Sequence, residues 1–377
     1  MNSIFESIIL FLKNNLYVAS LFVLLGSSIS VILLMPRVLY VAYQKRLTAP
    51  IIARSSHSRT VPSLGGVAFF MTFMIFISLI EMGLKNGVGY NIIAAISILF
   101  MVGLKDDLVN SSARVKLYGQ LLASIFIVFC TPFHIDTLHG FLGIHELYPI
   151  VSILISTLFL TFIINAYNLI DGIDGLAAII GIIISSMFML LFFLKKDYLF
   201  FLLCAMMIGT LIGFLRFNLS SGRMKMFMGD CGSLLIGMMI GIFTLHYLSS
   251  EPLSPSIRLF VPDNRVIFIS AVLFIPLFDT IRIIIIRILN GKSPFEADRN
   301  HLHHILLDKG FSHLKASMAL GVLNVLVLAV FFITSKFLNH LNLLGIMVLL
   351  YLLIALYFYK QKRALHFKKT FSTNTNS

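Results

Sequence analysis

Long apolar stretches separated by short polar segments account for most of this 377-residue chain. Each stretch has roughly the length of an α-helix that crosses a bilayer, about 20 residues. The pattern predicts eleven spans, at residues 16–36, 64–84, 91–104, 118–132, 147–169, 174–194, 198–217, 233–248, 266–288, 314–338 and 341–359. We therefore expect an all-α, polytopic integral membrane protein with about eleven transmembrane helices.

The composition favours one membrane domain over a soluble core. Hydrophobic residues make up 58% of the chain, charged residues make up 12%, and the mean hydropathy is +0.96. A soluble domain carries about twice that share of charge. We assign residues 1–369 to a single multi-span domain and expect the polar residues 370–377 to form a disordered tail.

Basic residues are distributed unevenly between the two sets of connecting segments. One set, together with the C-terminal tail, holds twenty Lys and Arg residues, and the other holds seven. Because basic loops stay in the cytoplasm, we predict a cytoplasmic C-terminus and a periplasmic N-terminus. The same bias explains the net charge of +13 without a nucleic-acid partner.

Unusual polar sequences occur only in connections on the predicted cytoplasmic side. They are SHSRTVPSLGG (56–66), GLKDDL (103–108), SARVKLYGQ (112–120), NAYNLIDGIDG (165–175), RMKMFMGDCGS (223–233) and SPFEADRNHLHH (293–304). The connections on the other side contain no comparable cluster. This one-sidedness indicates a single site that faces the cytoplasm.

Two adjacent carboxylates, Asp106 and Asp107, follow the third span. They can simply solvate a helix end, but near a bilayer two acids are costly unless they are paired or bound to a cation. Lys105 and Lys116 can supply that pairing, so the acid pair alone leaves both interpretations open.

Acids and amides alternate after the fifth apolar stretch, where Asn165, Asn168, Asp171 and Asp174 are three residues apart. On a continuing helix this spacing puts them near one face. Carboxylate and amide oxygens suit a hard cation such as Mg²⁺. The alternative is a polar turn between two helices, broken by glycines.

Asp230 lies among glycines at the start of the eighth span. It can cap the helix, since Asp is favoured at helix N-termini. A glycine-bounded helix start can also receive a phosphate on its amide groups. Phe227, three residues earlier, can stack on a base or pack in the core.

A histidine segment, with Arg299, His301, His303 and His304, precedes the tenth span. A zinc site is disfavoured because no cysteine lies near and the histidines lack the usual i, i+4 helical spacing. Histidines beside an arginine can instead bind a phosphate or sugar hydroxyls. Asp279, inside the ninth span, is interpreted as the structural partner of a salt bridge with Arg282.

Together, the acidic clusters indicate phosphoryl transfer at the membrane surface. Acids that hold Mg²⁺, with bases outside them, are typical of pyrophosphate handling. The basic residues that surround the acids are Arg54, Arg59, Lys116, Arg223 and Lys225. An ion-coupled transporter is the alternative of another class, but it needs acids in mid-span and often a repeat. A phosphotransferase of the CDP-alcohol type would pack its acids into one longer run.

In these motifs the sequence resembles the polyprenyl-phosphate N-acetylhexosamine-1-phosphate transferases, in particular the bacterial WecA type. GLKDDL, NAYNLIDGIDGLA, MFMGDCGSLLIG and SPFEADRNHLHHIL look like the signature segments of that family, in the same order. The resemblance implies an enzyme of the bacterial inner membrane with its active site on the cytoplasmic face. It would transfer a sugar-1-phosphate from a UDP-N-acetylhexosamine to undecaprenyl phosphate in the lipid bilayer, and release UMP. Family members are often homodimers.

The resemblance also implies roles for individual residues. Asp230 matches the main Mg²⁺ ligand, with Mn²⁺ as the alternative ion, and Asn168 matches a second position near the metal. Asp106, Asp107 and Lys116 would handle the lipid phosphate. The remaining substrate contacts would be made by Asp171, Asp174 at the uracil edge, Phe227 stacked on uracil, and Arg299, His301, His303 and His304 on the sugar side.

Two questions stay open in the sequence. The lipid phosphate can attack the β-phosphorus directly, with Asp106 or Asp107 orienting it, or a carboxylate can attack first and form an aspartyl-phosphate. The donor sugar is also open. Leu302 interrupts the histidine run that the muramyl-pentapeptide transferase carries, which favours UDP-GlcNAc. Donors with FucNAc, QuiNAc or MurNAc-pentapeptide are the alternatives, and the product would initiate O-antigen, capsule or teichoic-acid type glycans.

Overall fold

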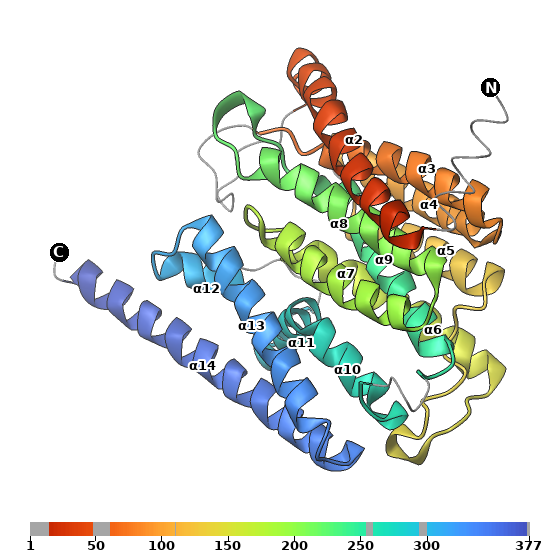
Figure 1. The fold of residues 1–377 in the computed structure, drawn as a ribbon. Helices are drawn as coiled ribbons and strands as arrows, with labels where there is room; N and C mark the ends of the chain where they lie inside the picture. Colours follow the sequence, from red (N-terminus) through yellow and green to blue (C-terminus); the bar gives the residue numbers. More distant parts are fainter. Residues whose placement is uncertain (1–14, 48–60, 110, 254–258, 294–299, 375–377) are drawn as a thin grey trace.

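The structure is a computed structural model, and it describes residues 15–47, 61–109, 111–253, 259–293 and 300–374 (Figure 1). Within these ranges the chain is helical and has no β-sheet, only one isolated bridge between Thr137 and Glu146. The helices are α2 (Leu16–Gln44), α3 (Gly65–Leu84), α4 (Val88–Val109), α5 (Ala113–Cys130), α6 (Pro149–Ile170), α7 (Leu176–Leu194), α8 (Tyr198–Asn218), α9 (Gly229–Ser249), α10 (Arg265–Val272), α11 (Phe274–Leu289), α12 (Leu302–Asp308), α13 (His313–Thr334) and α14 (His340–Asn374), with short 3₁₀ turns at Phe141–Gly143, Gly222–Met224 and Pro262–Asn264.

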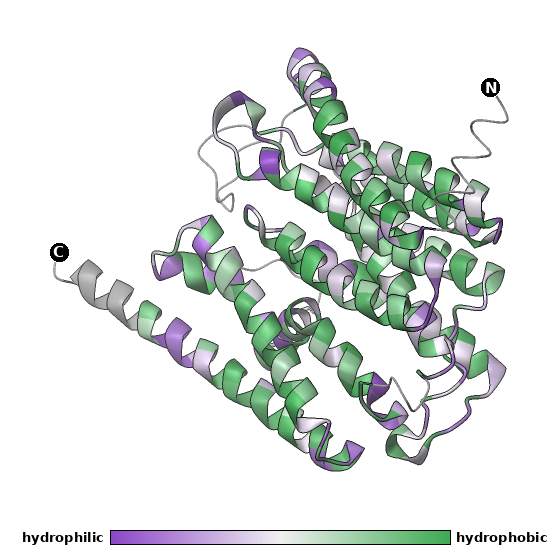
Figure 2. Ribbon diagram, in the orientation of Figure 1, coloured by the Kyte–Doolittle hydropathy of each residue, from purple (hydrophilic) through white to green (hydrophobic). Residues whose placement is uncertain are grey.

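The all-α, multi-pass membrane architecture is confirmed. In the described part of the chain, nine helices are long and apolar enough to cross a membrane, or ten if a bent pair forms one span. The predicted span 91–104 lies in α4, between α3 and α5, and each of the other ten predicted stretches overlaps at least one helix. Apolar residues run along the helices and hydrophilic ones gather at their ends and connections (Figure 2).

Local sequence explains where several helices begin. Pro149 stands at the first turn of α6, a position that tolerates its missing N–H. Asp197 caps α8 by accepting a hydrogen bond from the Phe200 N–H (3.2 Å), and Ser312 caps α13 through the Lys315 N–H (3.4 Å).

The centre of the bundle is formed by α8 and α9. Of their most apolar 18-residue windows, 83% and 94% of the residues are buried, against 17% for α14. The sequence of α9 is apolar or small on every side, as expected for a helix that is surrounded by other helices. It packs on α3, α4 and α6, so its first turn lies among their ends.

The predicted span 266–288 is not one continuous helix. It is divided into α10 and α11, and the pair is bent by 75°. Pro276 has no N–H to bond the carbonyl of Val272, four residues earlier. The buried Asn324 side chain on α13 donates to that carbonyl (3.2 Å) and accepts from the Ile275 N–H (3.1 Å). The break is therefore stabilised by a side chain from a different helix.

Replacing Asn324 with leucine is expected to lower the free energy of unfolding by about 2–6 kcal/mol, because two buried backbone groups each lose a partner worth about 1–3 kcal/mol. The chain has no tryptophan, so unfolding is best followed with a thiol-reactive dye that reports the buried Cys204 and Cys231. The exposed Cys130 would be replaced by serine. A loss no larger than that of Asn342→Leu, at an exposed position of α14, would contradict this account.

The last helix extends into the region where a polar tail is predicted. The residues predicted to form a tail, 370–377, overlap α14, which continues to Asn374. Residues 375–377 lie outside the described part of the chain, and side chains are described as far as Leu365.

Candidate active site

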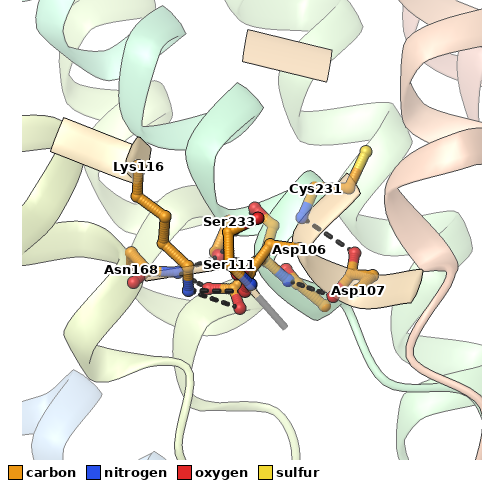
Figure 3. A network of polar contacts seen from close by, with 9 residues as sticks. Asp106, Asp107, Ser111, Lys116, Asn168, Cys231 and Ser233 are labelled. Atoms are coloured by element: carbon orange, nitrogen blue, oxygen red, sulfur yellow. Dashed lines mark hydrogen bonds and ion pairs between the residues drawn. The ribbon is translucent and has the colours of Figure 1, made fainter. Parts of the chain in front are cut away.

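The polar segments singled out in the sequence meet at one end of the bundle. Neighbouring helices run in opposite directions, so the end of α4, the start of α5, the end of α6 and the start of α9 lie on the same side. Figure 3 shows Asp106, Asp107, Lys116 and Asn168 grouped around the first turn of α9. The predicted convergence on one side is confirmed for these residues.

At the centre of this site, two carboxylates share one ammonium group. Lys116 Nζ lies 2.6 Å from Asp106 Oδ2 and 2.9 Å from Asp230 Oδ2. Asp106 is buried, and its Oδ1 accepts a hydrogen bond from the Ser111 N–H (2.6 Å). Asp230 and Lys116 are partly exposed, with 27% and 24% of their side chains accessible. The centre is therefore a half-open arrangement of charges that a ligand can enter.

Asp107 has a different set of partners from its neighbour. Its Oδ1 accepts from the Asp230 N–H (2.9 Å) and its Oδ2 from the Cys231 N–H (3.0 Å). These are free amide groups at the start of α9, which a carboxylate satisfies while it also interacts favourably with the helix dipole. Asp107 thus caps α9 from another helix, and the Asp230 side chain is left to face Lys116.

The loop before α9 is held by the segment that precedes α3. The Phe227 N–H donates to the Pro62 carbonyl (2.9 Å), and the Gly65 N–H donates to the Phe227 carbonyl (3.1 Å). Gly229 has a φ of +75°, and a Cβ there would lie 2.0 Å from the Ser63 carbonyl oxygen. Only glycine fits this turn, which sets the direction in which Asp230 leaves the loop.

Asn168, in the last turn of α6, binds Asp230 directly. Its Nδ2 donates to Asp230 Oδ1 (2.6 Å) and to Ser233 Oγ (2.7 Å). Asn165, one turn earlier, instead donates to Gln120 and to the Thr161 carbonyl. The helix ends at Ile170, so Asp171 and Asp174 lie in the following turn and not on a continued face of α6.

Asp171 makes no side-chain hydrogen bond with any residue that the structure describes, although it is half-buried. Burial, together with the nearby charges of Asp230 and Asp174, raises its pKa to about 7. A carboxylate in this state gains from any cation or hydrogen-bond donor that a substrate brings. Asp171 is thus ready to bind a ligand without first losing a protein partner.

We expect Asp171→Asn to gain stability relative to the wild type as the pH rises from about 5 to about 8. The folded-state pKa of about 7 lies above the ordinary 3.8, so ionisation of Asp171 destabilises the wild type progressively across this range. Thermal unfolding in EDTA would measure the trend. The control is Glu146→Gln, at an exposed position without a side-chain partner in the described part of the chain, and it is expected to show no such trend. A constant difference between Asp171→Asn and wild type at all pH values would contradict the assignment.

Asp174 is fixed by three residues from two elements, the loop before α9 and the helix α13. Its Oδ2 pairs with Lys225 Nζ (2.6 Å) and with His313 Nδ1 (3.1 Å) on α13, and its carbonyl accepts from Ser317 Oγ (2.8 Å). Burial alone would raise its pKa, but the bonds from His313 and Lys225 hold the pKa below its usual value. Lys225 Nζ also lies 5.7 Å from the centre of the Phe227 ring. Lys225 therefore contacts both residues predicted to bind the base, Asp174 and Phe227.

The histidine segment packs against this turn. A Cβ on Gly172 would lie 2.3 Å from His303 Nε2, so the imidazole lies directly against the backbone between Asp171 and Asp174. Burial, with the nearby His304, lowers the pKa of His303 to about 3, which keeps that ring neutral. His301 bonds Asp279 through Nδ1 (2.9 Å). Arg299 lies outside the described residues.

Three contacts were not predicted. His313, Ser233 and Gln120 hold Asp174, Asn168 and Asn165, respectively. Gln120 and Ser233 are the last residues of two of the polar clusters, and His313 precedes the tenth apolar stretch, but nothing in the sequence indicates which side chain each one contacts. Only the spatial arrangement of the helices brings these side chains to the site.

The donor set suits magnesium better than zinc. In the described ranges, no group of three or more His, Cys, Asp or Glu side chains is arranged to hold a metal ion. Mg²⁺ is usually bound by one or two carboxylates together with substrate phosphates and water. Asp230 and Asp106, whose oxygens already converge on one cationic nitrogen, fit that requirement.

Comparison with known proteins decides the family. The sequence profile of glycosyl transferase family 4 matches residues 90–248, which include Asp106, Lys116, Asn168 and Asp230. The chain is 30% identical over 285 residues to the decaprenyl-phosphate N-acetylglucosaminephosphotransferase of Mycolicibacterium smegmatis, and the match covers 70% of this chain and 69% of the relative. The chain belongs to glycosyl transferase family 4.

Two further relatives of this family 4 chain carry names of the same kind. The probable undecaprenyl-phosphate N-acetylglucosaminyl 1-phosphate transferase of Bacillus subtilis is 34% identical over 275 residues, or 69% of each chain. The undecaprenyl-phosphate alpha-N-acetylglucosaminyl 1-phosphate transferase of Salmonella typhi is 29% identical over 315 residues, or 82% of each chain. The resemblance found in the sequence is confirmed, and the protein is a phospho-sugar transferase of the multi-pass membrane type.

Proposed function

We propose that this family 4 transferase moves GlcNAc-1-phosphate from UDP-GlcNAc to undecaprenyl phosphate, with release of UMP. The observation that carries the proposal is the convergence of Asp106, Lys116 and Asp230 at the first turn of α9. The names of the relatives support transfer of N-acetylglucosamine phosphate to a polyprenyl phosphate, which is undecaprenyl phosphate in two of the names and decaprenyl phosphate in the third. The product, an undecaprenyl-pyrophosphoryl sugar, would initiate a cell-envelope glycan of the O-antigen, capsule or teichoic-acid type.

The active site faces the cytoplasm in this proposal, and the protein lies in the bacterial inner membrane. The excess of Lys and Arg on the connections that form the site supports this orientation. It places the N-terminus in the periplasm and the C-terminus in the cytoplasm. A UDP-sugar then reaches the site from the cytoplasm, and the lipid phosphate reaches it from the bilayer.

Asp230, with Asp106 beside it, would hold Mg²⁺, and Mn²⁺ is the alternative ion. When bound, the ion neutralises charge on the diphosphate and on departing UMP. Asn168 orients Asp230 through its hydrogen bond to Oδ1, so that Oδ2 faces Lys116 at the centre of the site. Asp107 fixes the first turn of α9 and so keeps the Asp230 side chain in place.

Lys116 and Asp106 would position the acceptor. The ammonium group of Lys116 attracts the lipid phosphate, one of whose oxygens attacks the β-phosphorus in line. The bond between the β-phosphorus and its bridging oxygen to the α-phosphate breaks, and UMP takes the electron pair. The acceptor already carries an anionic oxygen, so positioning supplies most of the catalysis.

Direct attack is favoured over an aspartyl-phosphate intermediate. Both oxygens of Asp106 and both of Asp107 are occupied by hydrogen bonds or an ion pair, which makes these carboxylates poor nucleophiles. We therefore expect no exchange of labelled UMP into UDP-GlcNAc when undecaprenyl phosphate is absent. Exchange at a rate near that of transfer would show a covalent intermediate and contradict direct attack.

The donor would lie along the turn between α6 and α7. Phe227 stacks on uracil, Asp174 contacts its edge, and Asp171 completes the substrate contacts of the turn. His303 lies against the same turn, with the rings of His301 and His304 beside it, and these three histidines would contact the sugar. The role of Arg299 rests on the sequence resemblance. Other UDP-amino sugars, with FucNAc, QuiNAc or MurNAc-pentapeptide, are the alternative donors.

A panel of UDP-sugars tests this proposal. The purified full-length protein is mixed with undecaprenyl phosphate and one UDP-sugar at a time, with Mg²⁺ or EDTA, and UMP release is followed. We expect Mg²⁺-dependent release with UDP-GlcNAc. Release of UMP only with a different UDP-amino sugar would show that UDP-GlcNAc is not the donor. Release of UMP that EDTA does not reduce would show that transfer needs no divalent metal ion.

A further inference from the structure

The buried carboxylate of Asp279 joins the broken span to the histidine segment. Only 2% of Asp279 is exposed. Its Oδ1 accepts from Arg282 Nη2 (2.7 Å) and from the Leu302 N–H (3.1 Å), and its Oδ2 lies 2.9 Å from His301 Nδ1. A simple ion pair with Arg282, as interpreted from the sequence, would need none of the bonds to residues 301 and 302.

The break in the span sets the position of this carboxylate. Asp279 lies on α11, one turn after Pro276, and the 75° bend directs α11 away from the line of α10. Arg282, on the same helix, also donates to the Asn300 carbonyl. Residues 279 and 282 thus hold both the backbone and the first ring of the histidine segment.

A carboxylate at Nδ1 determines which tautomer the imidazole adopts. An ionised Asp accepts but cannot donate, so His301 must carry its proton on Nδ1, and Nε2 becomes the atom left for another partner. The neighbours of the His301 ring are Asp279 on α11, whose other oxygen pairs with Arg282, and the rings of His303 and His304 on α12, at 5.5 and 6.5 Å. Among these neighbours, Asp279 alone is an acceptor in contact with Nδ1.

The ring of His303 lies between His301 and the proposed active site. His303 is nearly parallel to His301, with an angle of 12° between the rings, and it lies against Gly172. Gly172 directly follows Asp171 in the chain and lies two residues before Asp174. The imidazole fixed by Asp279 is therefore one ring away from the turn that would bind the donor.

We propose that Asp279 is a positioning residue for the transferase, which holds His301 in the Nδ1–H form so that Nε2 is available to the sugar-phosphate part of the donor. This inference rests on the proposed function, and it gives the buried Asp279 a part in catalysis. Arg282 and the Leu302 amide hold Asp279 itself. No atom is transferred in this step, and Asp279 stays ionised.

The first test is Asp279→Asn. An asparagine can turn its oxygen to Arg282 and Leu302 only by presenting its NH₂ to His301, which favours the opposite tautomer. We expect kcat to fall about 100-fold or more, as wrong-tautomer variants do elsewhere. The KM for the UDP-sugar should change less than about threefold, because the substitution leaves the turn at Asp174 intact.

A double-mutant cycle separates positioning from folding. His301→Asn keeps a donor near the place of Nδ1 and removes Nε2, so the bond to Asp279 and the fold are retained. We expect it to lose at least as much kcat as Asp279→Asn. Adding Asp279→Asn to it should then cost less than about twofold more, because the two residues act through one atom. Equal losses from Asp279→Asn in both backgrounds, or a fully active His301→Asn, would overturn the proposal.

The tautomer can also be measured without any substrate. In ¹⁵N-histidine-labelled protein, the His301 signal is the one missing from His301→Asn, and we expect an Nδ1–H pattern that changes to Nε2–H in Asp279→Asn. An unchanged pattern would overturn the positioning role even if the protein transferred sugar. Conversely, a correct tautomer in protein that uses no UDP-sugar would indicate that the proposed function had failed.

A matched control exists at the opposite end of the bundle. Asp197, before α8, pairs with His246 Nε2 at 2.5 Å, the same kind of contact far from the site. Asp197→Asn should leave kcat within about twofold of wild type. Asp197 and His246 are partly exposed, so a loss equal to that of Asp279→Asn would mean that even a partly exposed Asp–His pair is needed for folding alone, and it would remove the specific role of Asp279.

Discussion

Asp230→Asn is expected to abolish sugar-phosphate transfer, with a loss of about 1,000-fold or more, while the protein still inserts and folds. The substitution keeps the size of the side chain and an acceptor for Asn168. It removes the negative charge that pairs with Lys116 and that would hold the cation. Preorganised charge of this kind commonly contributes several kcal/mol to a transition state. Steady-state UMP release by equal amounts of folded protein is the measurement.

The control for Asp230→Asn is Asp136→Asn. Asp136 is an exposed carboxylate on the connection between α5 and α6, at the other end of the bundle. We expect wild-type transfer from this control. An Asp230→Asn enzyme that retained more than about a tenth of wild-type activity would exclude Asp230 as the main cation ligand.

Lys116→Met is expected to damage both stability and activity. Without the ammonium group, the carboxylates of Asp106 and Asp230 lose their shared partner and repel each other. Breaking a buried pair costs about 3–5 kcal/mol, and the lower end applies here because Lys116 is 24% exposed. Transfer should fall at least about 100-fold, since the acceptor phosphate loses its positive contact.

Magnesium should partly restore the stability of Lys116→Met. A divalent cation can take the place of the ammonium group between the two carboxylates, so Mg²⁺ should raise the unfolding temperature of the variant more than that of the wild type. For Lys116→Arg, which keeps the positive charge on a wider group, Mg²⁺ should raise the unfolding temperature by an amount between those of wild type and Lys116→Met. Equal Mg²⁺ effects on wild type and Lys116→Met would contradict a shared carboxylate site.

The helices were predictable because the apolar pattern alone determines them. Each span needs only enough length and hydrophobicity, and every stretch chosen from the sequence overlaps at least one helix. The bend after Val272 was not predictable in the same way. Pro276 is visible in the sequence, but the bend also depends on Asn324, whose place beside Val272 is a property of the packed bundle.

The site was predictable as a location but not as a network. The one-sided distribution of polar motifs correctly predicted that four residues lie close together, namely Asp106, Lys116, Asn168 and Asp230. Sequence reasoning could not separate Asp106 from Asp107. In the structure the first faces Lys116 and the second caps α9, because successive residues on a helix point about 100° apart.

The histidine segment shows the same limit. Its residue types indicated phosphate or sugar contact, and its packing on Gly172 agrees with a position beside the donor. Its dependence on Asp279 had no signal in the sequence, since an acid and an arginine three residues apart read as a local pair. The bond to His301 comes from a residue 22 positions away.

The most direct test of the central claim follows the β-phosphate. UDP-GlcNAc labelled with ³²P at that position is given to purified protein with undecaprenyl phosphate and Mg²⁺, and label is counted in the lipid and nucleotide fractions. If the enzyme transfers sugar-1-phosphate, the label moves to the lipid, and one UMP is released for each lipid product. Label that stays in released UDP, with unlabelled sugar on the lipid, would show ordinary glycosyl transfer and contradict the account.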